Sequence, residues 1–328
     1  MSLMPYRPVP WLRSGHLQTL MVGLQCGWRP PYSADRLLID LPDGEQLVVH
    51  AERPSPLDKS APIVILIHGL GGDHSSPYLQ RLAHRLAHRG MRVWRVDLRG
   101  CGAGFDLAWR PPHAGRSDDV AAVVQLARRR FPDSVIRLVG FSLSGNIVLK
   151  MLGEAAIGNS LVGPEDVERA IAIAPPVELS RCADRIDRLD NNLYTRYYLK
   201  MLGKQVNRRR GAWEQWAKLP TKPVPRTIRQ FDALYTAPLS GFKDTEHYYA
   251  SSSARPLMEF IKTPTTILVD QHDPIIEPRS FRDLPENESL AIQWTRHGGH
   301  MGYFGRDDAG KPVRWMELFV THRLLRES

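Results

Sequence analysis

Ser142 stands in a local sequence that would let its hydroxyl group act as a nucleophile. It lies in the run Gly140-Phe-Ser142-Leu-Ser144-Gly145, between a short apolar stretch and a stretch with helical spacing. A sharp strand-to-helix turn of this kind strains its apical residue, so the residues two positions away must be small. Gly140 satisfies this fully, and Ser144 is only slightly larger than glycine. The turn would place the Ser142 hydroxyl above a helix start, where the dipole favours negative charge.

A nucleophilic serine needs a base and a group that orients the base. We expect His300 to be the base, because it follows two glycines in the loop after a predicted strand, whereas His297 lies closer to the strand end. We expect Asp273 to orient the imidazole, since it lies within the loop after the preceding predicted strand. Asp270 is the lesser alternative, because it is expected to end that strand.

Backbone N–H groups are the expected donors to the oxyanion. The segment His68-Gly-Leu-Gly-Gly72 follows a predicted central strand, and its glycines let the N–H of Leu70 turn toward an oxyanion. The N–H of Leu143, directly after the nucleophile, is the expected partner. Together these groups are those needed for acyl transfer through a serine.

The glycine-rich segments do not fit a nucleotide site. His68–Gly72 has neither the dinucleotide-binding spacing nor the glycine-lysine-serine ending of a phosphate loop. Gly100-Cys-Gly-Ala-Gly104 also follows a predicted strand, but no helix with the right spacing opens from it and Pro111-Pro112 interrupts soon after. We predict no nicotinamide and no other cofactor.

The histidine spacing does not favour a metal centre. His84 and His88 lie on one face of a predicted helix, but they lack the glutamate of the His-Glu-x-x-His pattern and sit among arginines. A solvated helix face is the simpler interpretation. His297 and His300 lie close together in a glycine loop, where His300 is already expected to be the base. We predict no bound metal.

Alternating strands and helices must bring these loops together. The predicted strands are 36–41, 45–51, 63–67, 92–96, 135–139, 170–174, 265–269 and 291–295. Predicted core helices are 78–89, 118–130 with Ser117 as N-cap, one that opens after Ser142, and 313–325. This alternation indicates an α/β fold with a mostly parallel sheet and helices on both faces. The loops at the carboxyl ends of such strands share one edge, and each candidate residue lies in one.

The alternation stops at Pro175-Pro176 and resumes near Pro264. The sequence in between is helical, basic and aromatic, with no run typical of a buried strand. We therefore expect three parts. These are an N-terminal arm with the first part of the core at 1–176, a helical cap insertion at 177–263, and the second part of the core at 264–328.

Composition is that of an ordinary soluble protein, with 42% hydrophobic and 24% charged residues in 328. No apolar run approaches the length of a membrane span, and the N-terminal sequence lacks the apolar core of a secretory signal. The cysteines are odd in number and far apart: Cys26, Cys101 and Cys182. We expect a cytoplasmic protein in a reducing compartment.

The formal net charge is +9, and the basic residues are densest at Arg208-Arg209-Arg210. Such a run is typical of a solvated face, and it is compatible with transient contact with an anionic lipid surface. No nucleic-acid motif or stacking aromatic pattern accompanies it, so we expect no nucleic-acid partner. The sequence leaves the oligomeric state open.

With these residues assembled, the chain resembles the α/β-hydrolases, and more narrowly their YheT-like branch, which is related to eukaryotic abhydrolase-domain lipases. The matching motifs run almost from end to end: His16-Leu-Gln-Thr19, His68-Gly-Leu, Ser76-Pro-Tyr78, Arg99-Gly-Cys-Gly102, His113-Ala-Gly-Arg-Ser-Asp-Asp119, Gly140-Phe-Ser-Leu, Gly145-Asn146, Asn192-x-Tyr194, Tyr197-Tyr-Leu-Lys, Phe231-Asp232, Ala237-Pro-Leu-Ser-Gly-Phe242, Tyr248-Tyr249, His272-Asp-Pro274 and Gly298-Gly-His-Met-Gly302. The cap motifs are the specific part of the resemblance. The chain order serine, aspartate, histidine is also that of α/β-hydrolases.

The resemblance implies a serine hydrolase acting on acylglycerols or other medium-chain acyl esters, and a cytoplasmic protein without an anchor could equally prefer short, soluble esters. Two departures from the branch pattern, Ser144 at the turn and Gly71-Gly72 in the glycine loop, remove no catalytic group. The hydrophobic N-terminal anchor of the eukaryotic relatives is not in this sequence, so we expect no stable membrane anchor.

Two other functions stay open. The same acyl-enzyme could pass its acyl group to an alcohol or thiol, as an acyltransferase does, or the scaffold could bind a ligand without catalysis. We expect the aromatic residues of the cap to cover an apolar acyl pocket and to form the core of the cap: Tyr194, Tyr197, Tyr198, Trp213, Trp216 and Phe231. His16-Leu-Gln-Thr19 is expected to pack the N-terminal arm over the sheet rather than to catalyse.

Overall fold

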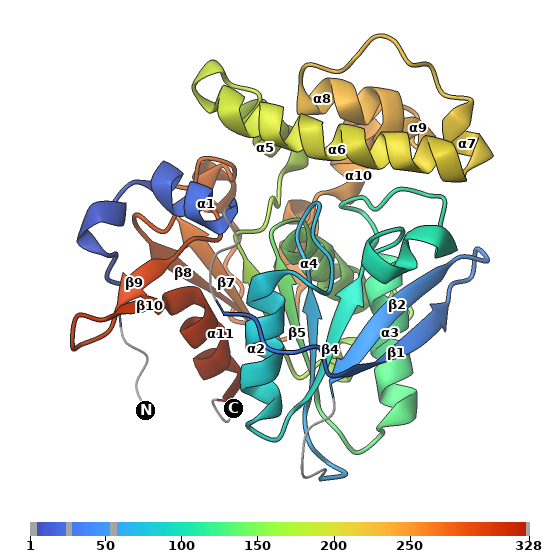
Figure 1. The fold of residues 1–328 in the computed structure, drawn as a ribbon. Coiled ribbons are helices and arrows are strands. Elements are labelled where there is room, and N and C mark those ends of the chain that lie inside the picture. Colours follow the sequence, from blue (N-terminus) through green and yellow to red (C-terminus); the bar gives the residue numbers. More distant parts are fainter. Residues whose placement is uncertain (1–4, 24–27, 53–57, 326–328) are drawn as a thin grey trace.

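The structure is a computed structural model, and it describes residues 5–23, 28–52 and 58–325. Its centre is an eight-stranded sheet in the order β1-β2-β4-β3-β5-β6-β7-β8 (Figure 1). The strands are β1 Ala34–Asp40, β2 Gln46–Glu52, β3 Ile63–Ile67, β4 Arg92–Asp97, β5 Ile136–Phe141, β6 Arg169–Ile173, β7 Thr265–Asp270 and β8 Leu290–Thr295. Strands β4 to β8 of this order run parallel, and β2 pairs antiparallel with β1 and β4. The predicted α/β fold is confirmed.

Helices cover both faces of the sheet. Helices α2 (Pro77–Ala87) and α11 (Trp315–Leu325) pack against each other on one face, and α3 (Ser117–Arg130) and α4 (Leu143–Ala156) lie together on the other (Figure 1). Every residue of β3 is fully buried. A continuous apolar strand of this kind is expected where both faces of a parallel sheet are covered.

The chain between β6 and β7 forms a layer of helices over the carboxyl edge of the sheet (Figure 1). These helices are α5 Leu179–Ile186, α6 Asn192–Ala212, α7 Glu214–Ala217, α8 Ile228–Phe231, α9 Ala237–Leu239 and α10 Thr245–Ser252. Their buried side chains form an apolar cluster separate from that of the sheet, with Leu202, Trp216 and Phe231 among its members. We refer to this layer as the cap.

Arg209 joins the cap to the core, and the prediction of a solvated basic face is wrong for this residue. Its side chain is buried, and its guanidinium donates to the carbonyl oxygens of Gly100 at 2.8 Å and Ala108 at 3.3 Å. The same group lies over the ring of Trp216. A buried guanidinium that satisfies several carbonyl groups holds two layers in one relative position.

Two local predictions need correction. Ser117 is the first residue of α3 rather than its N-cap, because its hydroxyl accepts a hydrogen bond from the Lys150 ammonium at 3.1 Å instead of capping the helix. The last helix begins at Trp315, because the residues before it form β10 (Pro312–Arg314), which pairs with β9 (Phe304–Arg306) in a two-stranded sheet. Cys26 lies outside the described residues, and Cys101 and Cys182 are buried free thiols.

Among the helices of residues 5–23, 28–52 and 58–325, none is both long enough and apolar enough to cross a membrane.

Candidate active site

Ser142 occupies the sharp turn between β5 and α4, with φ of 50° and ψ of −116°. A positive φ is strained for a residue with a side chain, and such strain persists only where surrounding contacts hold it. The Ser142 N–H donates to the carbonyl of Ile173 on β6 at 2.8 Å. A Cβ atom on Gly140 would come within 2.3 Å of the Ser144 carbonyl oxygen, so only glycine fits there. The turn therefore presents Ser142 at the edge of the sheet.

The structure brings Ser142, His300 and Asp273 into one hydrogen-bonded series. His300 Nε2 lies 2.9 Å from Ser142 Oγ, and His300 Nδ1 lies 2.9 Å from Asp273 Oδ2. Asp273 is buried, and its other oxygen accepts from the N–H groups of Ile275 at 2.7 Å and Ile276 at 2.9 Å. These bonds keep the carboxylate in place, so that it fixes the orientation and tautomer of the imidazole.

The two lesser alternatives lie elsewhere. Asp270 ends β7 and accepts from the N–H groups of Gly298 at 2.8 Å and Gly299 at 3.2 Å, so it holds the loop that carries His300. Burial raises the pKa of Asp270. His297 Nδ1 lies 2.6 Å from the Arg13 carbonyl oxygen, which turns this ring toward the N-terminal arm.

The N-terminal arm contacts the His300 loop directly, and the sequence pattern alone did not reveal this contact. Helix α1 (Gly15–Gly23) carries Thr19, whose hydroxyl oxygen accepts from the His300 N–H at 2.9 Å. Gln18 donates to the Phe304 carbonyl at 3.0 Å and accepts from the Phe304 N–H at 2.8 Å. The motif His16-Leu-Gln-Thr19 therefore holds the loop on which His300 stands.

The glycine loop after β3 lies directly against the turn at Ser142. A Cβ on Gly69 would stand 3.1 Å from Ser142 Cβ, so the loop backbone passes close to the serine. The Ser144 hydroxyl donates to the His68 carbonyl oxygen. Ser144, which stands where the common turn pattern has glycine, thus connects this loop to the turn. Leu143 begins α4, where the first N–H groups have no acceptor within the helix.

His68 is a fixed part of this loop. Its Nε2 accepts from the Leu98 N–H at 3.1 Å, and its Nδ1 donates to the Gly69 carbonyl at 2.8 Å. Burial lowers the pKa of His68, so the neutral ring keeps this donor and acceptor pattern. The role of His68 is to hold the loop, not to exchange protons.

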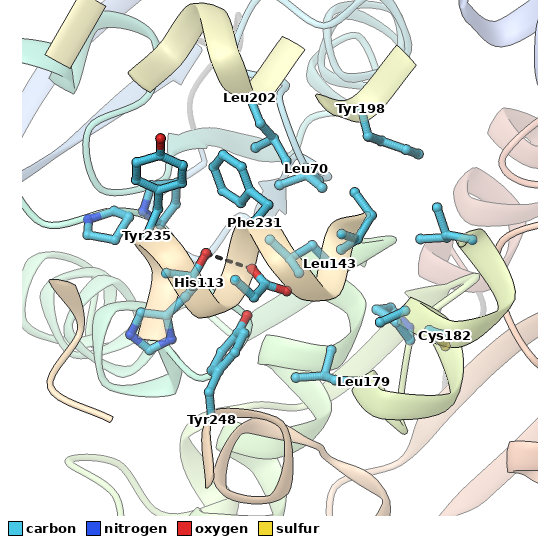
Figure 2. Close-up of a pocket in the computed structure, with 18 of the residues that line it drawn as sticks. Leu70, His113, Leu143, Leu179, Cys182, Tyr198, Leu202, Phe231, Tyr235 and Tyr248 are labelled. Atoms are coloured by element: carbon cyan, nitrogen blue, oxygen red, sulfur yellow. Dashed lines mark hydrogen bonds between the residues drawn. The ribbon is translucent and has the colours of Figure 1, made fainter. Parts of the chain in front are cut away.

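Two cavities meet at Ser142. The inner cavity, about 120 Å³, lies beneath the cap and is lined mainly by apolar side chains, with Leu70, Leu143, Leu179, Leu202 and Phe231 among them (Figure 2). The outer cavity, about 380 Å³, lies between α1 and the first turns of α6 and includes His300 in its wall. Leu70, Ser142, Tyr198 and Ile275 line both cavities. A molecule bound at Ser142 can therefore extend into both cavities.

The inner cavity also holds buried polar groups. Burial raises the pKa of Asp232 to about 6, although hydrogen bonds from Thr236 at 2.6 Å and Tyr249 at 2.8 Å oppose the shift. Burial, with a further contribution from Arg116, holds the pKa of His113 well below its usual range. Neither side chain lies in the hydrogen-bonded series of Ser142.

Within the described residues, one group of three side chains could hold a metal ion: His50, His74 and Asp97. Asp97 accepts from His50 Nε2 at 3.0 Å, from the His74 N–H at 2.6 Å and from the Ala103 N–H at 2.8 Å. Burial alone would raise the pKa of Asp97, but the bonds from the two histidines outweigh it and hold this pKa well below its usual range. The cluster ties the far end of the glycine loop to β2 and β4.

Comparison with known proteins gives consistent results. A family model described as alpha/beta hydrolase fold matches residues 62–307. The Escherichia coli protein YheT, named provisionally as an esterase, is 29% identical over 94% of this chain and 90% of its own length. The monoacylglycerol lipase of Saccharomyces cerevisiae is 29% identical over 79% of this chain and 58% of its own. The Pyrococcus furiosus esterase Pf2001 has a TM-score of 0.54 and 17% identity, covering 91% of this chain and 92% of that one.

Proposed function

This chain belongs to the alpha/beta hydrolase family, and we propose that it is a serine hydrolase that cleaves carboxylic esters of short- to medium-chain acyl groups. The observation that carries the proposal is the hydrogen-bonded series from Asp273 through His300 to Ser142. The esterase and lipase among the relatives support the reaction class. No metal or cofactor takes part in the proposed reaction.

The first half of the reaction acylates the serine. As Ser142 Oγ bonds to the ester carbonyl carbon, its proton moves to His300 Nε2 and the carbonyl electron pair moves onto oxygen. The N–H groups of Leu70 and Leu143 donate to that oxyanion. The bond to the alcohol oxygen then breaks, and His300 gives its proton to the departing alcohol. Asp273 stays ionised and holds the imidazolium.

The second half returns the serine. Water attacks the acyl carbon while its proton moves to His300 Nε2, and a second oxyanion forms at the same N–H groups. The bond from carbon to Ser142 Oγ breaks, His300 returns the proton to that oxygen, and the carboxylic acid leaves. The balance is one ester and one water consumed, one alcohol and one acid produced.

The two cavities suggest how the ester lies in the site. We assign the acyl group to the inner cavity, because it lies beneath the cap and its walls are largely apolar. We assign the alcohol to the outer, larger cavity, which His300 lines and into which a protonated alcohol would leave. A single water molecule needs a cavity of roughly 10–15 Å³. The inner cavity, at about 120 Å³, therefore has room for an acyl group of several carbon atoms.

The test uses p-nitrophenyl esters from acetyl to dodecanoyl, with wild type and Ser142→Ala. We expect turnover with an optimum at short to medium chains, and its loss in the variant. Fluorophosphonate should label Ser142 in the wild type and in Ser144→Ala, the neighbouring serine serving as the control. Absence of both turnover and labelling would overturn the proposal. Adding an alcohol and measuring product partition separates hydrolysis from acyl transfer.

A further inference from the structure

His113 lines the inner cavity and has a ring N–H without a hydrogen-bond partner among the described residues. Its Nδ1 accepts from the Gly115 N–H at 3.1 Å, which leaves the proton of the neutral ring on Nε2. The residue is only 6% exposed and lines the cavity (Figure 2). Within the part of the chain that the structure describes, Nε2 has no hydrogen-bond partner. Buried polar groups normally have one, so this N–H is available to a ligand.

Tyr248 supplies a second donor beside it. Its hydroxyl oxygen accepts from the Ala114 N–H at 3.2 Å, while its own proton has no acceptor among the described side chains and carbonyl groups. The rings of His113 and Tyr248 are perpendicular, with centroids 5.8 Å apart, and both line the inner cavity (Figure 2). Two neighbouring donors without acceptors suit one oxygen atom that can accept from both.

The position of these donors follows from Asn146. Its side-chain amide donates to the Ala114 carbonyl at 3.0 Å and to the Ser252 carbonyl at 2.8 Å, which holds the 113–115 loop and the end of α10 against α4. Asn146 lies four residues after Ser142, and four residues of α-helix advance about 6 Å. The 113–115 loop and the end of α10 are therefore held on the order of one helical turn along α4 from Ser142.

We propose that the inner cavity selects acyl groups that carry a hydrogen-bond-accepting oxygen, a ketone or ether oxygen, a few carbons from the ester carbonyl, which His113 and Tyr248 bind together. This inference rests on the proposed ester hydrolysis and names the substrate class. A plain alkyl chain that fills the cavity leaves both donors without partners. A site that loses such partners discriminates more strongly than one that loses only a methylene contact.

Asp232 adds a limit on the charge of the acyl group. Its carboxyl group lines the same cavity and accepts from Thr236 and Tyr249. Where Asp232 is ionised, a second carboxylate in the cavity would be repelled. The acyl group is therefore neutral, and half-esters of dicarboxylic acids are poor substrates.

The experiment compares matched pairs of p-nitrophenyl esters: pentanoyl with 4-oxopentanoyl, and hexanoyl with 5-oxohexanoyl. We expect wild type to show a kcat/KM about tenfold higher for the oxo ester in at least one pair. Because p-nitrophenyl esters differ in intrinsic reactivity, each value is divided by the rate of hydroxide hydrolysis of the same ester. The glutaryl half-ester should be hydrolysed more slowly than the hexanoyl ester.

Variants assign the selectivity to the two donors. His113→Phe and Tyr248→Phe should each bring the oxo-to-plain ratio close to one, and His113→Gln, which keeps an N–H donor, should retain part of it. Tyr197→Phe, in the outer cavity, should keep the wild-type ratio. Equal corrected rates for both members of both pairs in wild type would overturn the inference and leave the esterase proposal intact. If the wild type hydrolyses none of these esters, the result would instead count against the esterase proposal.

Discussion

The hydroxyl oxygen of Thr19 accepts a hydrogen bond from the backbone N–H of His300 at 2.9 Å. Thr19 donates its own proton to the Gly15 carbonyl oxygen at 2.7 Å, so α1 acts as a support for the histidine loop. A Cβ on Gly299 would come within 2.2 Å of the same Gly15 oxygen, which shows how closely the loop and the helix pack. An N-terminal helix and the loop between β8 and β9 thus determine together where the proposed base stands.

Replacing Thr19 by valine should lower kcat about tenfold and leave KM nearly unchanged. The change keeps the shape of the side chain but leaves the buried His300 N–H without its acceptor, at a cost of roughly 1–3 kcal/mol. Thr19→Ser keeps the oxygen and should restore most of the activity. The measurement is kcat and KM for one p-nitrophenyl ester in all three proteins. Wild-type kcat in Thr19→Val would show that the contact does not position His300.

Ser144→Ala should reduce kcat/KM by about tenfold, because it removes the hydrogen bond to the His68 carbonyl that holds the glycine loop beside Ser142. The N–H of Leu70 would then be less well placed for the oxyanion. Ser134→Ala is the matched control, since Ser134 is also buried and donates to the Lys59 carbonyl at 3.2 Å, on a different loop. Both variants should lose about 1 kcal/mol of unfolding free energy. Equal activities in the two variants would contradict the prediction.

Substitutions of Asp273 and Asp270 should have different effects, the first mainly on kcat and the second mainly on the stability of the fold. Asp273→Asn is expected to lower kcat by a factor on the order of 10³–10⁴, because an amide favours the wrong imidazole tautomer. Asp270→Asn should lower kcat by no more than about tenfold but destabilise the fold by roughly 1–3 kcal/mol, since its carboxylate accepts from the Gly298 and Gly299 N–H groups. The measurements are steady-state kinetics, which give kcat, and urea unfolding, which gives the free energy of unfolding, for both variants. The reverse ranking in kcat would assign the orienting role to Asp270.

The sequence predicts the fold well because its signals are local. Strand β3 is a continuous apolar run with the same bounds in sequence and structure, and the polar residues that follow the strands gather at one edge. The structure brings Ser142, His300 and Asp273 together there, and their catalytic roles remain predictions. The burial of Arg209 and the position of Ser117 inside α3 could not be predicted, because each depends on a partner distant in sequence. Arg209 donates to the Gly100 carbonyl, and the Ser117 hydroxyl accepts from Lys150. The place of His113 in the inner cavity could not be predicted either, because residues of the cap, such as Tyr248, form the rest of the cavity wall.

Asp232 should make the stability of the protein depend on pH between about 4 and 6. Its pKa is raised from an ordinary 3.8 to about 6, so the folded protein binds a proton that the unfolded chain has already released. Stability from this group is fully present below its ordinary pKa and is lost as the pH rises through about 6. The shift corresponds to roughly 2–3 kcal/mol. Asp232→Asn should therefore flatten the dependence of unfolding free energy on pH in this range.

Thr236→Val sharpens the Asp232 prediction. The Thr236 hydroxyl donates to the carboxylate and so favours its charged form. Without this donor the pKa of Asp232 should rise further, and the loss of stability should extend to higher pH than in wild type. The measurement is urea unfolding of wild type and both variants at half-unit steps from pH 4 to 8. The same pH profile in all three proteins would mean that Asp232 is not the group responsible, whereas opposite changes in the two variants assign the dependence to this buried carboxyl.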